Sequence, residues 1–239
     1  MPPMDREKYI SRQKTADMTR PGTIGLPEYN HWGLSDIIVD AEILNYTDIE
    51  IIGDDRVQVY CMIKCKIHRI FAQRKISEST GESQAQQVGD IITIRIPASS
   101  KIAVTPYPEI AVGQRWMLPL QQMHPAAVVL MSMDNKDASY MITKWLKYAF
   151  SVPIKLDDHG NAFADTTSME LCMNQLENGM YAERWKKSPT FPKQLIDQKN
   201  HKIKDLDALS EFMQQAMYWW DHDAYDKGYR LSKNIDPIE

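Results

Sequence analysis

Two short runs place a histidine beside aspartates, Asp157-Asp158-His159 and Asp221-His222-Asp223. Carboxylate and imidazole groups bind divalent metals and act as general acids and bases. Neighbouring residues of an extended segment face in different directions, however, and no matching set of ligands is spaced elsewhere in the chain. We therefore interpret the first run as a solvated loop and the second as a helix end, and we predict no metal site.

Cys61 and Cys65 lie in a segment that alternates between apolar and polar residues, as a β-strand does. Their thiols then point to the same buried face about 13 Å apart, which is too far to share a zinc ion. We interpret both as small core side chains. With Cys172 they make three cysteines, and the N-terminus lacks the apolar run of a signal peptide. This pattern predicts a reducing compartment, either the cytoplasm or a virion.

Tyr140 and Lys144 form the Tyr-x3-Lys pair that short-chain dehydrogenases use for proton transfer. The chain has no glycine-rich strand-turn-helix segment to bind a dinucleotide, so we reject this interpretation. The nucleophile elbow, the phosphate-binding loop and the H-E-x-x-H zinc motif are missing as well. We predict that the protein is not an enzyme and has no cofactor. An enzyme whose site is assembled from loops, near His124 or near Asp157 and His159, remains an alternative.

Composition predicts a globular protein. The 239 residues are 43% hydrophobic and 25% charged, which is enough to form a full core. The formal charge of −4 gives no global electrostatic reason to bind nucleic acid or an anionic membrane. No stretch approaches the roughly 20 apolar residues that a membrane-spanning helix needs. We expect no membrane insertion.

Residues 1–33 are rich in proline and glycine without a sustained apolar period, and predict an extended N-terminal arm. Tyr29 and Trp32 lie in this arm, although a fully solvated tail rarely carries such side chains. We favour docking of the arm on its own chain over docking on a neighbouring molecule.

Period-two alternation follows the arm, with Ile37, Val39, Ala41 and Ile43 on one face. We predict strands at 36–43, 56–67, 91–97, 114–120 and 126–133, a mobile polar loop near 76–88, and a helix from Asp137 to Ala149. Because no crossover helices separate the strands, residues 34–150 should form an antiparallel β-barrel or small sandwich, with an oligonucleotide/oligosaccharide-binding (OB)-type barrel fitting best. The whole chain is then an α+β protein.

Residues 151–239 predict a helical module. A linker over 151–165 precedes a capping box at Thr167-Ser168-Met169-Glu170, and Asn178-Gly179 suits the end of that helix. After a proline-marked break at 188–192, a last helix carries an apolar stripe at three- and four-residue spacing. The stripe consists of Leu206, Leu209, Met213, Ala216 and Trp220.

The outer face of the 56–67 strand carries cations around one aromatic residue. The candidate nucleic-acid contacts are Arg56, Tyr60, Lys64 and Lys66. Barrels bind single-stranded nucleic acid through such faces, although successive bases need several stacking platforms. A single-stranded nucleic-acid-binding protein is therefore an alternative function, and nucleic acid is not the favoured partner.

Charge is distributed unevenly near the C-terminus. Residues 184–204 hold seven basic residues and a single acid, Asp197, whereas residues 205–226 are acidic. Such a layout is typical of solvated faces, and it also lets identical copies pack side by side.

The organisation resembles that of the connector, neck and tail-adaptor proteins of tailed bacteriophages. The segments that carry the resemblance are the arm MPPMDREKYISRQKTADMTRPG, the loop KISESTGESQAQQVGD and the segment SKIAVTPYPEIAVGQRW. The resemblance implies a non-enzymatic virion component that assembles with copies of itself and with other structural proteins. Aromatics beyond the needs of one core anchor interfaces, which makes Tyr29, Trp32, Trp219 and Trp220 the candidate contacts.

Overall fold

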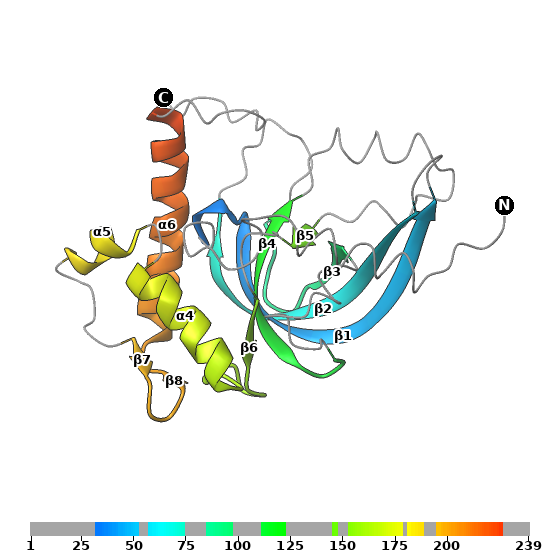
Figure 1. Ribbon diagram of the computed structural model, residues 1–239, viewed down its shortest axis with the longest axis horizontal. Helices are drawn as coiled ribbons and strands as arrows, with labels where there is room; N and C mark the ends of the chain where they lie inside the picture. Colours follow the sequence, from blue (N-terminus) through cyan, green and yellow to red (C-terminus); the bar gives the residue numbers. More distant parts are fainter. Residues whose placement is uncertain are drawn as a thin grey trace.

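A curled sheet and a helical C-terminal part make up the protein in the computed structural model (Figure 1). The structure describes residues 32–52, 57–74, 85–97, 111–122, 145–147, 153–178, 181–188 and 195–226. The elements are η1 (Trp32–Leu34), β1 (Ile37–Ile52), β2 (Val57–Gln73), β3 (Ile91–Pro97), β4 (Arg115–Gln122), β5 (Trp145–Lys147), β6 (Ile154–Leu156), α4 (Thr166–Asn178), α5 (Ala182–Lys186), β7 (Ile196–Asp197), β8 (Lys202–Ile203) and α6 (Leu206–Asp226). The predicted α+β class is confirmed.

Six strands form the main sheet in the order β1-β2-β3-β5-β4-β6, and β1 also pairs with β4. All of these pairs are antiparallel except β3 with β5, which is parallel. The sheet is therefore mixed, whereas the sequence predicted a purely antiparallel one. Strands predicted near 36–43, 56–67, 91–97 and 114–120 are confirmed as β1 to β4.

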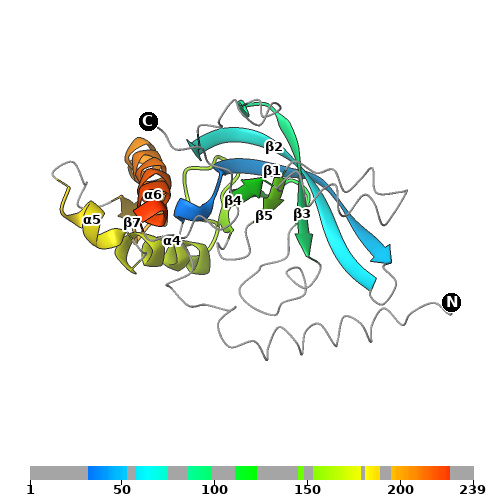
Figure 2. The same ribbon diagram turned by 90° about the horizontal axis from the view of Figure 1, so that it is seen from above.

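The β1–β2 hairpin is long and bent (Figure 2). Its register shifts at three points, between Ile38 and Val39, between Asp40 and Ala41, and between Ile43 and Asn45. Bulges of this kind increase local twist and bend a strand. The bend lets one hairpin pair with β3 along β2 and with β4 along β1.

One face of the sheet, called the inner face here, carries the first core. Its buried residues follow the predicted alternation and are Ile37, Val39, Ala41, Ile43, Ile63, Cys65, Ile67, Ile92, Ile94, Trp116, Leu118 and Leu120. These β-branched, aliphatic and aromatic side chains suit a pleated, buried surface. Alternation along β3 and β4 places Ile94 and Trp116 on this face, and they are 1% and 0% exposed.

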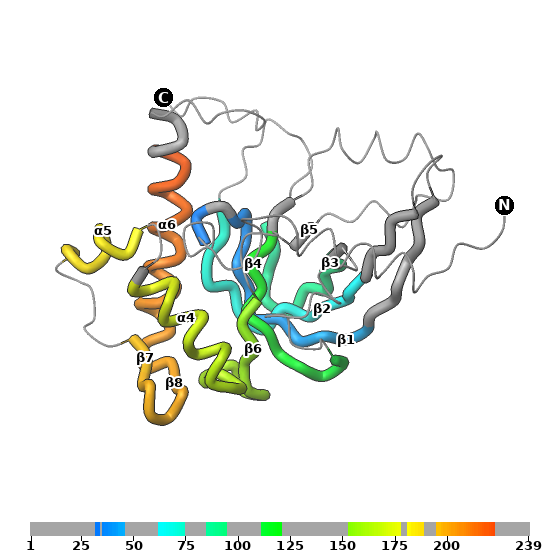
Figure 3. Tube along the Cα trace, viewed as in Figure 1, coloured from blue at the N-terminus to red at the C-terminus, as the bar shows by residue number. Residues whose placement is uncertain are grey.

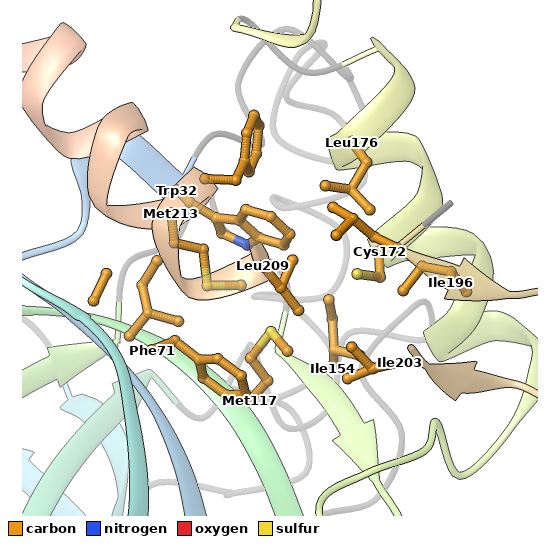
Figure 4. Close-up of a cluster of buried hydrophobic side chains, with 14 of the residues drawn as sticks. Trp32, Phe71, Met117, Ile154, Cys172, Leu176, Ile196, Ile203, Leu209 and Met213 are labelled. Atoms are coloured by element: carbon orange, nitrogen blue, oxygen red, sulfur yellow. The ribbon is translucent and has the colours of Figure 1, made fainter. Parts of the chain in front are cut away.

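The opposite, outer face is buried where the C-terminal part covers it (Figure 4). Ile38, Phe71 and Met117 pack there against residues of α4 and α6, including Cys172 and Leu209. Period-two alternation predicted a solvated outer face for this part of β1. The structure corrects that expectation, because α6 and α4 cover the outer face there while the first core buries the inner face.

Two local predictions in the middle of the chain are wrong. Residues 145–147 form β5 rather than part of a helix, because they fill the sheet between β3 and β4, and strand pairing there overrides the helical period. The linker predicted over 151–165 contains β6, which pairs with β4 and leads into α4 (Figure 3). The strand predicted at 126–133 and most of the polar loop lie outside the described residues.

The helices begin and end close to the predicted positions. The backbone N–H of Ser168 donates to Oδ1 of Asp165 at 2.7 Å, so Asp165 caps α4 and the proposed Thr167 capping box is not used. The helix ends at Asn178 as predicted. In α6 the predicted stripe residues Leu209, Met213 and Ala216 are buried. The short helix α5 was not predicted.

Candidate interaction surfaces

Trp32 belongs to the folded body of the protein and not to the N-terminal arm. It is 3% exposed in η1, and its indole packs edge-on against Phe212 of α6 with 5.8 Å between ring centroids. A Cβ added at Gly33 would lie 2.7 Å from the carbonyl oxygen of Ala216, so only glycine allows this close approach. Docking on the chain itself is observed for Trp32, which has no exposed ring to offer a partner. Tyr29 lies outside the described residues.

Arg74 joins the end of β2 to η1 and α6. Its Nε donates to both carboxylate oxygens of Asp221, at 3.1 and 2.8 Å. Its two terminal nitrogens donate to the carbonyl oxygens of Ser35 and Gly33, at 2.5 and 2.6 Å. Asp36 pairs with the same guanidinium at 3.2 Å. The Asp221-His222-Asp223 run therefore contributes a structural carboxylate, because Asp221 is already engaged by Arg74.

A second ion pair joins the sheet to the loop after β6. Arg115 of β4 pairs with the buried carboxylate of Asp40 and donates to the carbonyl oxygen of Asp158 at 2.7 Å. Gly160 lies beside both side chains with φ at +69°, and an added Cβ would come within 3.0 Å of the Arg115 guanidinium carbon. No local pattern indicates this site, since the partners are 75 positions apart.

The Asp157-Asp158-His159 run is a turn, as predicted. Oδ1 of Asp157 accepts hydrogen bonds from the backbone N–H groups of His159 and Asn161, both at 3.1 Å, which is the pattern of an Asx turn. Asp158 and His159 are exposed. Among the described residues, no group of three metal-binding side chains comes together. His124, Tyr140 and Lys144 lie outside that part of the chain.

The two described cysteines are buried and free. Burial raises the pKa of the Cys65 thiol to about 12, and burial raises the pKa of Cys172 further. Burial favours the protonated form of both thiols, and a protonated thiol is a poor nucleophile. Cys65 lies in the inner core, as its alternation predicted, whereas the side chain of Cys61 is not among those described.

Exposed Arg184 and half-buried Trp219 form a surface at α5 and α6, over the buried rings of Tyr181 and Trp185, and it is called the α5–α6 surface here. The Arg184 guanidinium lies 5.6 Å from the ring centroid of Tyr181 and 5.7 Å from that of Trp219. Trp219 is half-buried and also contacts Trp185, at 6.3 Å between centroids. Arginine stacked on aromatic rings is common in protein interfaces. Of the predicted interface residues, Trp219 lies in this cluster.

Tyr218 and His222 extend the α5–α6 surface along α6. Tyr218 is 55% exposed, and its ring lies 3.8 Å from the ring of His222. Trp220 is half-buried, and its Cβ lies close to Gly33, as does the ring of Tyr181. The helical period places Tyr218 opposite the buried stripe, as expected for an aromatic residue beyond the needs of the core.

Lys64 and Lys66 are exposed on the outer face of β2. Lys64 lies opposite Thr93, and Lys66 lies between Ile91 of β3 and Glu42 of β1. The two lysines predicted for nucleic-acid contact are thus on one surface, interrupted by an acid and an aliphatic residue. Tyr60 lies in β2 opposite Ile49 and Pro97, but its side chain is not described, and Arg56 is outside the described residues.

Comparison with models of protein families, with curated proteins and with solved structures finds no match to this chain. Among the described residues, no helix has the length and apolar character needed to cross a membrane.

Proposed function

We propose that the chain is a non-enzymatic structural protein that acts through protein–protein contacts. We propose further that it is an oligomeric virion component, such as a head–tail connector, neck or tail adaptor. The observation that carries the proposal is the α5–α6 surface, where Arg184 lies over Trp219, together with exposed Tyr218 and His222, which pack against each other on the same helix. Tyrosine, tryptophan and arginine are the residues that most often dominate binding energy in interfaces.

Charge on the same helices favours other copies of the chain as partners. Arg184, Lys186 and Lys187 are exposed on and after α5, and Asp207 and Glu211 are exposed on α6. A basic surface on one copy is therefore complementary to an acidic surface on the next. Exposed pairs of this kind direct association and set register more than they add affinity.

The proposal is tested by the mass of the intact chain, measured by light scattering over a hundredfold range of concentration. We expect a discrete oligomer whose fraction rises with concentration. Tyr218→Ala combined with Arg184→Ala should shift that equilibrium toward smaller species, and Lys199→Ala, in the exposed turn between β7 and β8, is the matched control. A monomer at every concentration, or an oligomer that the double substitution leaves unchanged, would contradict the proposal.

We also propose that β1 to β5 form a barrel of the OB type. The strand pairing supports it, because β1 pairs with β2 and β4, β2 with β3, and the short β5 with both β3 and β4. Barrels of this type bind oligonucleotides on the face of their second and third strands.

Exposed Lys64 and Lys66 lie on that face and favour single-stranded nucleic-acid binding as a second candidate function. Retention on single-stranded DNA that falls steeply with salt would support it. Lys64→Ala with Lys66→Ala should then reduce both the retention and its salt dependence. If the protein is retained no longer on a single-stranded DNA column than on an uncharged column, this second function is excluded.

A further inference from the structure

The α5–α6 surface runs from α5 to the exposed side of α6. Arg184 lies over both Tyr181 and Trp219, with its guanidinium carbon 5.6 and 5.7 Å from the two ring centroids. Trp219 and His222 are three positions apart in α6, and residues at this spacing are neighbours on a helix surface. His222 packs in turn against Tyr218, which is 55% exposed. The surface is thus a strip of rings with a cation at its α5 end.

The predicted N-terminal arm joins the folded body beside this strip. Residues 1–31 lie outside the described part of the chain, and the first described element is η1. A Cβ added at Gly33 of η1 would lie 2.7 Å from the carbonyl oxygen of Ala216 and 3.2 Å from Cε2 of Tyr181. Tyr181 therefore adjoins both Gly33 and Arg184. The arm is tethered at the edge of the α5–α6 surface.

The tether is long enough for the arm to reach the whole strip. An extended chain covers roughly 3.3–3.6 Å per residue, so the nine residues from Gly33 back to Ile24 span up to about 30 Å. An α-helix rises about 1.5 Å per residue, so Trp219 and His222 lie only about 4.5 Å apart along the axis of α6. Residues 24–29 can therefore lie on the strip while η1 stays packed on α6.

Residues 24–29, called the arm segment here, carry apolar side chains suited to a strip of rings. Their sequence is Ile-Gly-Leu-Pro-Glu-Tyr. Pro27 has a fixed φ and disfavours the helical conformation at Leu26, so the segment loses less conformational entropy when it binds in an extended form. Extended proline-containing segments bind to aromatic-lined surfaces for this reason. Leu26 and Tyr29 supply the apolar area for such a contact.

Charge also matches the arm segment to the strip. Its one charged residue is the acid Glu28. The α5 end of the strip is basic, because Arg184, Lys186 and Lys187 are exposed there, and Glu183 is the one acid within the described residues 181–188. A carboxylate that reaches a guanidinium accepts charge-assisted hydrogen bonds, which are stronger than those between neutral groups.

We propose that the arm segment docks on the α5–α6 surface of its own chain as a strap. Glu28 pairs with Arg184, and Leu26 and Tyr29 cover Trp219 and the neighbouring rings of α6. A short flexible tether holds a binding segment at an effective concentration on the order of millimolar. At lower protein concentrations the arm segment therefore meets its own chain before it meets a neighbouring one.

The strap competes with self-association. Under the proposed function the same surface binds other copies of the chain, and this part of the inference rests on that function, whereas the docking does not. A second copy must displace the arm segment before it can bind. Because only chains with an open surface are competent, the strap raises the concentration at which oligomers form.

A labelled peptide of residues 21–31 tests whether the surface is occupied in the full-length chain. The arm variant, as it is called here, carries Leu26→Ala, Glu28→Lys and Tyr29→Ala, which remove the contacts of the strap and keep the chain length. Fluorescence anisotropy should show at least tenfold tighter binding of the peptide to the arm variant than to the parent. The reason is that the arm of the parent occupies the surface.

Two controls locate the peptide on the surface. Tyr218→Ala with Arg184→Ala, added to the arm variant, should abolish binding of the peptide. A peptide of residues 227–239 is the matched control, because it contains the similar sequence Ile-Asp-Pro-Ile-Glu, and it should not bind. Circular dichroism confirms that each variant is folded.

An engineered disulfide tests whether the arm docks on its own chain. Glu28→Cys with Arg184→Cys should form a disulfide on mild oxidation of a dilute sample, because a docked segment brings the two positions within bonding distance. Mass spectrometry should find the link between residues 28 and 184 in the monomer. Glu28→Cys with Lys199→Cys is the control and should stay unlinked, since the β7–β8 turn lies near the other end of α6 (Figure 1).

The proposal is overturned if the peptide binds the parent and the arm variant equally, or binds neither. Binding of the 227–239 peptide in its place would also overturn it. A link between residues 28 and 184 that is found only in dimers would mean that the arm docks on a neighbouring copy, and would overturn the strap as well.

Light scattering separates the strap from the proposed function. The arm variant should form more oligomer than the parent at the same concentration. If the disulfide forms in the monomer while the arm variant has the mass of the parent at every concentration, the docking stands and the role of the α5–α6 surface in self-association is wrong. If the disulfide fails while Tyr218→Ala with Arg184→Ala still reduces the oligomer, the strap is wrong and the proposed function stands.

Discussion

Arg74 and Asp221 are 147 positions apart in the sequence, and their side chains pair across the contact between the sheet and α6. The guanidinium is 13% exposed and the carboxylate 29% exposed, so solvent screens the pair only in part. The same guanidinium satisfies two carbonyl oxygens of the η1 turn. One side chain therefore fixes the entry of the chain into β1 and the position of the last helix.

Replacement of Arg74 by alanine should destabilise the protein by about 1–3 kcal/mol, because it leaves a part-buried carboxylate and two carbonyl groups without their donor. Asp221→Ala should cost less, since Arg74 keeps its carbonyl partners. In a double-mutant cycle the two substitutions should couple by roughly 0.5–3 kcal/mol in urea unfolding. Strict additivity would mean that the pair does not contribute to holding α6 on the sheet.

Truncation of Trp116 or Ile94 to alanine should destabilise the inner core by roughly 2–5 kcal/mol through lost burial and a residual cavity. Both side chains are fully buried, so each truncation removes its full share of buried apolar surface. Ile91→Ala is a matched control, because Ile91 lies in the same strand and is 64% exposed. The midpoint of thermal unfolding should be close to that of the parent for the control. It should be clearly lower for the two core variants.

Gly160→Ala should be destabilising for two independent reasons. Its φ of +69° is unfavourable for a residue with a Cβ, and that Cβ would meet the paired side chains of Asp40 and Arg115. We expect a loss of more than 1 kcal/mol, the usual scale for such strain. Gly113→Ala has a similar φ but nothing within 4 Å, and so measures the backbone contribution alone. If both variants lose the same free energy of unfolding, the predicted clash of the Cβ at position 160 with Asp40 and Arg115 does not contribute.

The stability of the protein should fall as the pH rises above about 9. The pKa of Cys65 is raised from 9.0 to about 12 in the folded state, so the unfolded thiol ionises first. A raised pKa stabilises the folded state fully below the unfolded value, and this contribution is lost as pH rises toward the folded value. Cys65→Ala should make the fall in the free energy of unfolding between pH 9 and about 12 smaller, as measured by urea unfolding. An identical pH dependence in parent and variant would contradict the burial of this thiol in the native state.

Several features of the fold were determined by the sequence itself. Period-two alternation placed Ile37, Ile94 and Trp116 on the inner face, because a strand presents successive side chains to opposite sides of a sheet. Helical spacing placed Leu209 and Met213 in a buried stripe of α6 for the equivalent reason. Local signals of this kind require only the geometry of one element.

Other features were decided only when distant segments met. Trp32 looked like part of an arm but is buried, because α6 supplies Phe212 and a close approach at Gly33. Residues 145–147 form a strand because they pair with β3 and β4. The residues next to them in the sequence carry no information about these two partner strands. The pairing of Arg74 with Asp221, and that of Arg115 with Asp40, join residues 147 and 75 positions apart. Register and packing are set by contacts between elements, and so these pairs are decided by the tertiary structure alone.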